Sequence, residues 1–89
     1  MAKFVAYITF GDPDRVPEVR PRHRAYLQQL LAAGKLHESG PFVDGAGALI
    51  IYEAADETEA RAILAADPYS EANVLGDVHL REWNRVYPE

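Results

Sequence analysis

Cysteine is absent from this chain of 89 residues, so no disulfide can stabilise it. Metal-ligand spacings and phosphate-binding loops are missing too, and no apolar run approaches the ~20 residues needed to span a bilayer. Basic residues are scarce: nine Lys and Arg stand against 14 Asp and Glu, giving a net charge of −5. That balance disfavours nonspecific binding to a nucleic acid backbone. We therefore expect no nucleic acid or membrane partner, no metal and no cofactor.

Apolar residues, in contrast, are plentiful. A composition of 48% hydrophobic and 26% charged residues indicates a globular protein. We expect a single domain over residues 1–89, because this length leaves no room for a second one. A domain this small buries only roughly 60% of its unfolded surface, so a partner chain would add needed stability. Met1 leads almost directly into a strand pattern and not into a signal peptide, which favours a cytoplasmic location.

The first half of the chain reads as a strand followed by a helix. Lys3–Phe10 is rich in β-branched and aromatic residues and predicts a strand, which the turn residues Gly11–Asp14 end. Because proline is best tolerated in a first helical turn, we expect the helix to start near Arg20 or Pro21. Gly34 is placed to cap its C-terminus. The apolar stripe expected on this helix comprises Tyr26, Leu27, Leu30 and Leu31.

Two strands come next. A short one is expected over Leu36–Ser39, where Gly40-Pro41 stops it. The turn Asp44–Gly47 then leads into Ala48–Ala54, the most strand-like run in the chain.

The last part of the chain predicts a second helix and a final strand. Asp56 is placed to accept from the Glu59 amide while Glu59 reaches back, as in a capping box. Asp67-Pro68 ends this helix, because a residue before proline is pushed out of the α region. Val78–Val86 is expected as the last strand. The order is ferredoxin-like βαββαβ, an α+β fold with one antiparallel sheet and both helices on one face. The inward-facing residues of the second helix are Ala60, Ile63 and Leu64.

Both faces of this sheet are apolar, whereas the two helices can cover only one of them. A second copy of the same sheet would cover the other face, so we expect a symmetric homodimer. Trp83 and Tyr87 could contribute to that interface or could cap the core of the monomer. In the first strand, one face of the sheet receives Phe4, Ala6 and Ile8, and the other face receives Val5 and Tyr7. In the third strand, one face receives Leu49 and Ile51, and the other receives Ile50 and Tyr52.

His23 and Asp67 are the candidate chemical groups. His23 lies four residues before Leu27 on the same helical stripe, so its ring should point toward the sheet. Asp67 follows the second helix and could meet His23 across the fold to form a proton-transfer pair. Two structural readings stay open. His23 could be a half-buried histidine bonded to backbone, and Asp67 could satisfy amides in its own turn.

The remaining polar residues give weaker signals. Histidines at positions 37 and 79 share no close ligand spacing with His23, so a metal site is not predicted. A basic cluster precedes and begins the first helix, and it has two readings. It could be a solvated helix start, or the rim of a pocket that attracts an anionic substrate. The cluster comprises Arg15, Arg20, Arg22 and Arg24.

Several short blocks, in order and at familiar spacing over nearly the whole chain, resemble the YCII-related (YciI-like) family. The loop from Phe42 to Gly47 departs from the pattern, because it is shorter than in some relatives. That difference bears on the mouth of the pocket and therefore on substrate identity. The blocks are Val19-Arg20-Pro21-x-His23, Tyr26-Leu27, Gly34-Lys35-Leu36, Ser39-Gly40-Pro41, the strand at Gly47, and Asp67-Pro68-Tyr69.

The resemblance implies a single YCII-related domain that pairs into a dimeric α/β barrel. It also implies an active site built on a histidine and an aspartate, here His23 and Asp67. Activities attached to the family or its fold relatives are lyase or isomerase steps on small oxygenated rings, such as dehydrochlorination of chlorinated hydroxyquinols. The residues expected to bind substrate are Arg20, Ser39, Gly40, Pro41 and Tyr69.

These observations favour a small-molecule enzyme with cofactor-free acid–base chemistry. His23, held by Asp67, would remove a proton from a carbon or hydroxyl of a small cyclic substrate. Arg20 or a backbone N–H near Gly40 would stabilise the resulting negative charge on oxygen. The alternative is a non-catalytic, small-ligand-binding or accessory dimeric domain that keeps the same pocket but transfers no proton. A pocket filled by its own side chains would favour that alternative.

Overall fold

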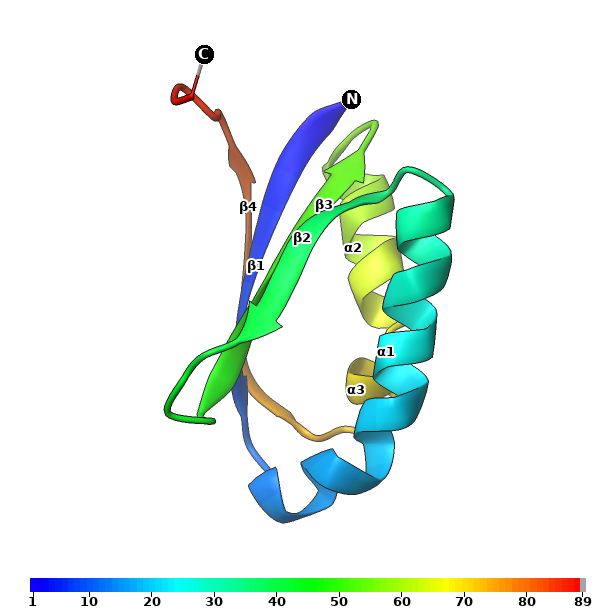
Figure 1. The fold of residues 1–89 in the computed structure, drawn as a ribbon, viewed down its shortest axis with the longest axis vertical. Coiled ribbons are helices and arrows are strands. Elements are labelled where there is room, and N and C mark those ends of the chain that lie inside the picture. Colours follow the sequence, from blue (N-terminus) through cyan, green and yellow to red (C-terminus); the bar gives the residue numbers. More distant parts are fainter. Residues whose placement is uncertain (89) are drawn as a thin grey trace.

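The computed structural model describes residues 1–88 and shows one antiparallel sheet with its helices packed on a single face (Figure 1). The strand order β2-β3-β1-β4 confirms the ferredoxin-like topology expected from the sequence. In chain order the elements are β1 (Ala2–Phe10), the 3-10 helix η1 (Pro13–Arg15), α1 (Val16–Ala32), β2 (Leu36–Pro41), β3 (Gly47–Ala54), α2 (Glu57–Ala65), α3 (Pro68–Glu71) and β4 (Leu75–Trp83).

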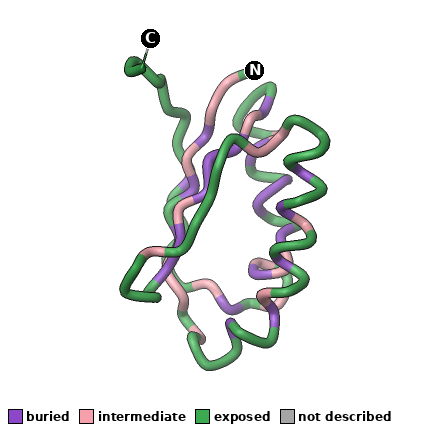
Figure 2. The backbone as a smooth tube through the Cα atoms, in the orientation of Figure 1, coloured by how far each residue is buried: buried purple, intermediate pink, exposed green. Residues whose placement is uncertain are grey.

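The core lies between the sheet and the helices. Alternate residues of the paired strands β1 and β3 face it, so that Phe4 lies opposite Tyr52 and Ala6 opposite Ile50. These four side chains are at most 1% exposed. The buried residues therefore lie where the sheet and the helices face each other, whereas the edge strand β2 is largely exposed (Figure 2). Helix residues that complete this core include Val19, Leu27, Leu30, Ala60, Ile63 and Leu64.

Helix α1 begins at Val16, earlier than the expected start near Arg20 or Pro21. Pro17 lies in the first turn, where a missing N–H removes no helical hydrogen bond. Pro21 lies inside the helix and removes only its own bond to the preceding turn. Burial of Val16 and Val19, 2% and 0% exposed, anchors the first turn against the core and offsets that loss.

The buried stripe of α1 differs in one position from the expected one. His23, Leu27 and Leu30 are buried as helical periodicity requires, whereas Leu31 is 59% exposed. Leu31 lies one residue past Leu30 and so about 100° around the helix, off the buried face. Gly34, at a φ of 75°, ends the helix as expected, since glycine adopts this left-handed conformation without a steric cost.

The second helical region is divided into α2 and α3. Asp56 accepts from the Glu59 amide at 2.8 Å as expected, and Glu59 reaches back to the Ala55 amide at 2.9 Å. The expected stop at Asp67 is correct, but a further short helix begins directly at Pro68. Within the described residues, no helix is long and apolar enough to cross a membrane.

β1 and β3 begin one residue earlier than expected, and β2 and β4 differ more from the expected strands. β2 continues through Gly40 to Pro41, because a strand paired on one side only can tolerate a residue without an N–H. β4 runs over Leu75–Trp83 and not over Val78–Val86. Gly76 fits this strand because the Thr9 side chain and the Gly11 backbone approach it closely. Tertiary pairing with β1 thus decides where β4 begins.

The sheet face opposite the helices is open in the single chain. Ile51 and Leu49 project there beside Val5 and Tyr7, and Tyr7 is 47% exposed. Trp83 borders the same apolar surface and is 41% exposed, so it does not cap the core of the monomer. Tyr87 is also exposed and does not cap the core either. We call the surface of Val5, Tyr7, Leu49, Ile51 and Trp83 the open sheet face.

Candidate active site

His23 and Asp67 meet in the interior, although 44 positions separate them in the sequence. Nδ1 of His23 lies 2.9 Å from each carboxylate oxygen of Asp67. The side chains are 9% and 1% exposed, so little water competes for this contact. The expected hydrogen-bond contact between the two residues is therefore present.

Asp67 also carries out the structural role that was considered as an alternative. It is the N-cap of α3, and its Oδ1 accepts a hydrogen bond from the Tyr69 amide at 2.8 Å. The residue before Pro68 is held in an extended conformation, which allows the carboxylate to turn back over the first turn of α3. The cap fixes the carboxylate in the position where His23 meets it.

Tyr69 supports the histidine ring from one side. The two rings are stacked with centroids 3.9 Å apart and planes inclined by 12°. Phe10 in turn packs edge-on against Tyr69, with centroids 5.5 Å apart. His23 is thus held at Nδ1 by Asp67 and on its face by Tyr69, which leaves little rotational freedom.

The Asp67 contact determines which ring nitrogen of His23 carries the proton and which is left free. A carboxylate only accepts hydrogen bonds, so it selects the His23 tautomer that carries its proton on Nδ1. Nε2 then has a free lone pair in the neutral ring and makes no hydrogen bond to any described residue. The free nitrogen can accept a proton from a group placed beside it.

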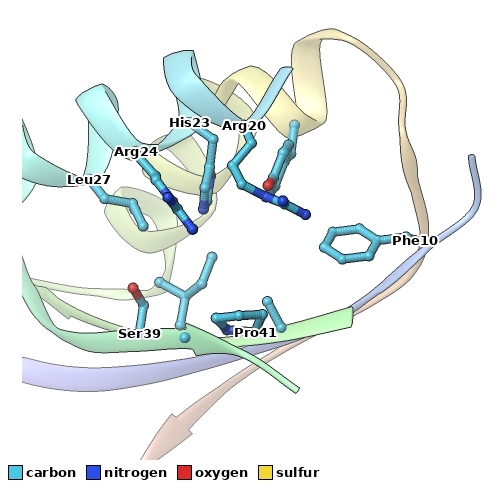
Figure 3. A pocket seen from close by; sticks show the side chains of 11 residues that line it. Phe10, Arg20, His23, Arg24, Leu27, Ser39 and Pro41 are labelled. Atoms are coloured by element: carbon cyan, nitrogen blue, oxygen red, sulfur yellow. The ribbon is translucent and has the colours of Figure 1, made fainter. Parts of the chain in front are cut away.

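His23 lines a cleft of about 270 Å³ between α1 and the sheet. Figure 3 shows its ring between Arg20 and Arg24, facing Ser39 and Pro41 across the opening. All five residues expected to bind substrate border this cleft. Asp67 does not line it and contacts His23 at Nδ1. The lining consists of Phe10, Arg20, His23, Arg24, Leu27, Ser39, Gly40, Pro41, Ala48, Ile50 and Tyr69.

The four arginines of the basic cluster do not all lie in the same place. Arg20 and Arg24 border the cleft, whereas Arg15 and Arg22 do not. Arg15 instead lies 3.7 Å from Asp12 in a surface ion pair. Five lining residues were not singled out as binding residues, and for Arg24 the available signal was its place in the basic cluster. They are Phe10, Arg24, Leu27, Ala48 and Ile50.

Two tyrosines, Tyr26 and Tyr52, lie near the carboxylate of Asp67. Burial raises the pKa of Tyr52, and the negative charge of Asp67 raises it further. The Tyr52 hydroxyl is fully buried and finds no hydrogen-bond partner in the described chain. Burial and Asp67 likewise raise the pKa of Tyr26, whose hydroxyl donates to the Ile63 carbonyl at 2.7 Å. Both phenols therefore stay neutral near Asp67 and neither lines the cleft.

The other histidines lie apart from this site. Nδ1 of His37 is 3.8 Å from Glu53, and His79 packs against Tyr7 on the opposite side of the sheet. In residues 1–88 no three His, Asp or Glu side chains are grouped as metal ligands would be.

A family model described as the YCII-related domain matches residues 2–84, nearly the whole chain. No functionally curated protein matches the sequence. The segment that matches the family model contains both His23 and Asp67.

Solved structures resemble the chain more distantly. A 5-chloro-2-hydroxyhydroquinone dehydrochlorinase from Burkholderia phenoliruptrix, in complex with 2,5-dihydroxybenzoquinone, is 24% identical with a TM-score of 0.81. The alignment covers 92% of this chain and 93% of that one. A cofactor-independent oxygenase from Streptomyces nogalater is 16% identical with a TM-score of 0.55, over 99% and 97% of the two chains. At these identities the likeness establishes a shared fold.

Proposed function

The chain belongs to the YCII-related family, and we propose that it is a small-molecule enzyme in which His23 and Asp67 perform cofactor-free acid–base chemistry. The observation that carries the proposal is the buried pair with one free ring nitrogen bordering a cleft. A general base must lie within hydrogen-bond reach of the proton that it removes, and this nitrogen is open to a ligand.

The size of the cleft supports a substrate built on one ring. Ligand sites for drug-sized molecules occupy roughly 300–1,000 Å³, and the volume of about 270 Å³ lies just below that range. The cleft is open and not filled by its own side chains, which supports ligand binding. The dehydrochlorinase of the same fold binds 2,5-dihydroxybenzoquinone, a small oxygenated ring. We take this substrate class, a small cyclic oxygenated molecule, for the present protein.

The reaction begins with proton transfer to Nε2 of His23. The electron pair of the broken O–H or C–H bond moves into the ring of the substrate and onto an oxygen. Asp67 keeps Nδ1 protonated and stabilises the imidazolium that forms, as the aspartate does in catalytic triads. Arg20, at the edge of the cleft, stabilises the charge that develops on oxygen.

Two outcomes complete the reaction, and both belong to the lyase or isomerase class. Loss of a leaving group from the ring is an elimination. Return of the proton to a different carbon is an isomerisation. In the elimination the leaving group departs with its bonding electrons and His23 passes its proton to water, whereas in the isomerisation the proton returns to the ring. Ser39, Gly40, Pro41 and Tyr69 position the substrate while it reacts.

Deuterium exchange tests the proton-transfer step without knowledge of the natural substrate. Small cyclic enols and hydroxyquinols, including 1,2,4-trihydroxybenzene and 2,5-dihydroxybenzoquinone, are followed by NMR in D₂O under argon. The wild-type protein should accelerate exchange of a ring C–H in at least one of them. His23→Gln should lower that rate by about 10²–10⁴-fold, the usual contribution of a general base.

Two further variants complete the experiment. Asp67→Asn should slow exchange while preserving the fold, since Asn can still accept from the Tyr69 amide but presents an N–H to Nδ1 and selects the wrong tautomer. His37→Gln removes a histidine outside the cleft and should leave exchange unchanged. Binding of these rings without exchange, or full exchange in His23→Gln, would instead support the accessory ligand-binding domain.

We also propose that the protein acts as a homodimer. The open sheet face carries large apolar side chains that no described helix covers, and the resemblance to the YCII-related family implies pairing through such a sheet. We take a second copy of this chain as the occupant, because one symmetric contact would cover the apolar face of both copies.

A further inference from the structure

The cleft beside His23 carries positive charge and no negative charge on its walls. Two arginines of α1 border it, and none of the lining residues is an aspartate or glutamate. This contrasts with the whole chain, which has a net charge of −5. Arg20 and Arg24 extend on either side of the His23 ring (Figure 3). The distribution favours an anionic ligand.

Neither arginine has a protein partner for its charge. Arg15 and Arg61 form ion pairs with Asp12 and Glu57, whereas Arg20 and Arg24 make no ion pair or hydrogen bond with the described part of the chain. A surface arginine needs no partner, but two unpaired ones that flank a buried His–Asp pair form a site for two oxygen atoms.

We propose that the substrate enters as a monoanionic, oxygen-substituted planar ring and leaves the proton-transfer step as a dianion held between Arg20 and Arg24. This inference rests on the proposed function, because it assigns the charge of the substrate at the same site. With His23 neutral, the two guanidinium groups and the Asp67 carboxylate leave one positive charge, which matches a monoanion.

The charges also match after proton transfer. The proton removed from the substrate resides on Nε2, so His23 and Asp67 become an ion pair without net charge. The substrate then carries two negative charges, and each faces one guanidinium group. The arginines are four residues apart on α1, which is about 6 Å along the helix axis at 1.5 Å per residue. Because the two side chains extend on either side of the His23 ring, each can contact one of two oxygens on opposite sides of a six-membered ring.

Calorimetry with two rings of equal size tests this charge assignment. The probes are 2,5-dihydroxybenzoquinone, which is anionic at neutral pH, and hydroquinone, which is neutral. The wild-type protein should bind the anion at least about tenfold more tightly, because hydrogen bonds to charged groups are the stronger ones. Raising the salt concentration should weaken binding of the anion and leave the neutral ring unaffected.

Three matched variants identify the residues responsible. Arg20→Gln and Arg24→Gln should each weaken binding of the anion by about tenfold or more without affecting hydroquinone. Arg22→Gln removes the same charge from the same helix outside the cleft and should change binding less than twofold. Equal binding of the two rings, or an effect of Arg22→Gln as large as the others, would overturn the inference.

The outcome is separable from that of the proposed function. Binding needs no turnover, so arginine-dependent anion binding without His23-dependent exchange would refute the catalytic proposal and keep the charge assignment. Exchange that depends on His23 but not on Arg20 or Arg24 would keep the catalytic proposal and refute the charge assignment.

Discussion

Asp67 accepts hydrogen bonds from His23 and from the Tyr69 amide, so a helix cap and a proposed catalytic carboxylate are the same side chain. The two roles support each other. The cap holds the carboxylate at the start of α3, and Tyr69, two residues later, places its ring against His23. The three residues Asp67-Pro68-Tyr69 thereby determine both the tautomer of His23 and the plane of its ring.

Tyr52 presents the opposite case, a buried polar atom without a partner. Its hydroxyl makes no hydrogen bond among the described residues, whereas the hydroxyl of Tyr26 donates to Ile63. An unpaired buried hydroxyl costs its full desolvation penalty, about 1–3 kcal/mol.

Replacing these hydroxyls should therefore have opposite effects on stability. Tyr52→Phe should leave the free energy of unfolding unchanged or raise it by up to about 2 kcal/mol, since only an unpaired group is removed. Tyr26→Phe, the matched control, should lower it by about 1 kcal/mol. Urea denaturation of both variants measures the difference. A loss greater than about 1 kcal/mol for Tyr52→Phe would show that its hydroxyl is bonded.

The same tyrosine gives an expected pH dependence. The pKa of Tyr52 is raised above its ordinary value of 10.0, so the folded protein keeps a proton that the unfolded chain loses above that pH. The unfolded state then binds fewer protons, and stability falls as pH rises through 10, by up to about 1.4 kcal/mol per pH unit for one group. Denaturation between pH 9 and 11 should show a shallower fall for Tyr52→Phe than for wild type.

Among the elements, β3 contains a position at which even one added methyl group would meet backbone. It pairs on both sides, with β1 and β2, and its Gly47 lies against the backbone of β1. A Cβ at this position would collide with the carbonyl oxygen of Ile8. The sequence marks this glycine as part of a turn, but the close approach of two strands is what requires it.

Gly47→Ala should lower the free energy of unfolding by more than about 2 kcal/mol, because the obstacle is backbone and cannot rotate away. Gly40→Ala on the adjacent strand is the control. Its added Cβ meets nothing within 4 Å, so a change within about 0.5 kcal/mol is expected. Thermal unfolding of both variants provides the comparison, and equal midpoints would show that the strands separate freely at Gly47.

On the scale of the whole molecule, the helices cover one side of the sheet and leave the other open (Figure 1). Neighbouring side chains shield Ile51 there, so that it is only 5% exposed, whereas Tyr7 and Trp83 remain accessible. A face of this kind stabilises a chain of 89 residues only if a second surface covers it.

Light scattering at micromolar concentration should report about twice the chain mass of 9.9 kDa. Leu49→Glu places a charge on the open sheet face and should shift the protein toward monomer, raising the dimer Kd by at least about tenfold. Leu31→Glu makes the same change at an exposed position on α1 and should leave the dimer intact. A monomeric wild-type protein would contradict the pairing of sheets.

Local sequence patterns determined most of the elements and part of the site. Strand alternation, the cap at Asp56 and the glycine at position 34 act over a few residues, so their consequences can be worked out from neighbours alone. Helical spacing likewise directed His23 inward, and the proline after Asp67 fixed where its helix ends. The family blocks added that these two residues belong together.

Tertiary structure decided what depends on distant segments. The start of β4 is set by pairing with β1, and Ser39, Gly40 and Pro41 of β2 form the side of the cleft that faces α1. Phe10 and Arg24 border the same site because β1 and α1 come together there. The basic cluster pointed to Arg24, whereas no local pattern pointed to Phe10. Contacts between residues far apart in sequence arise from the packing of whole elements, and packing is a property of the assembled chain.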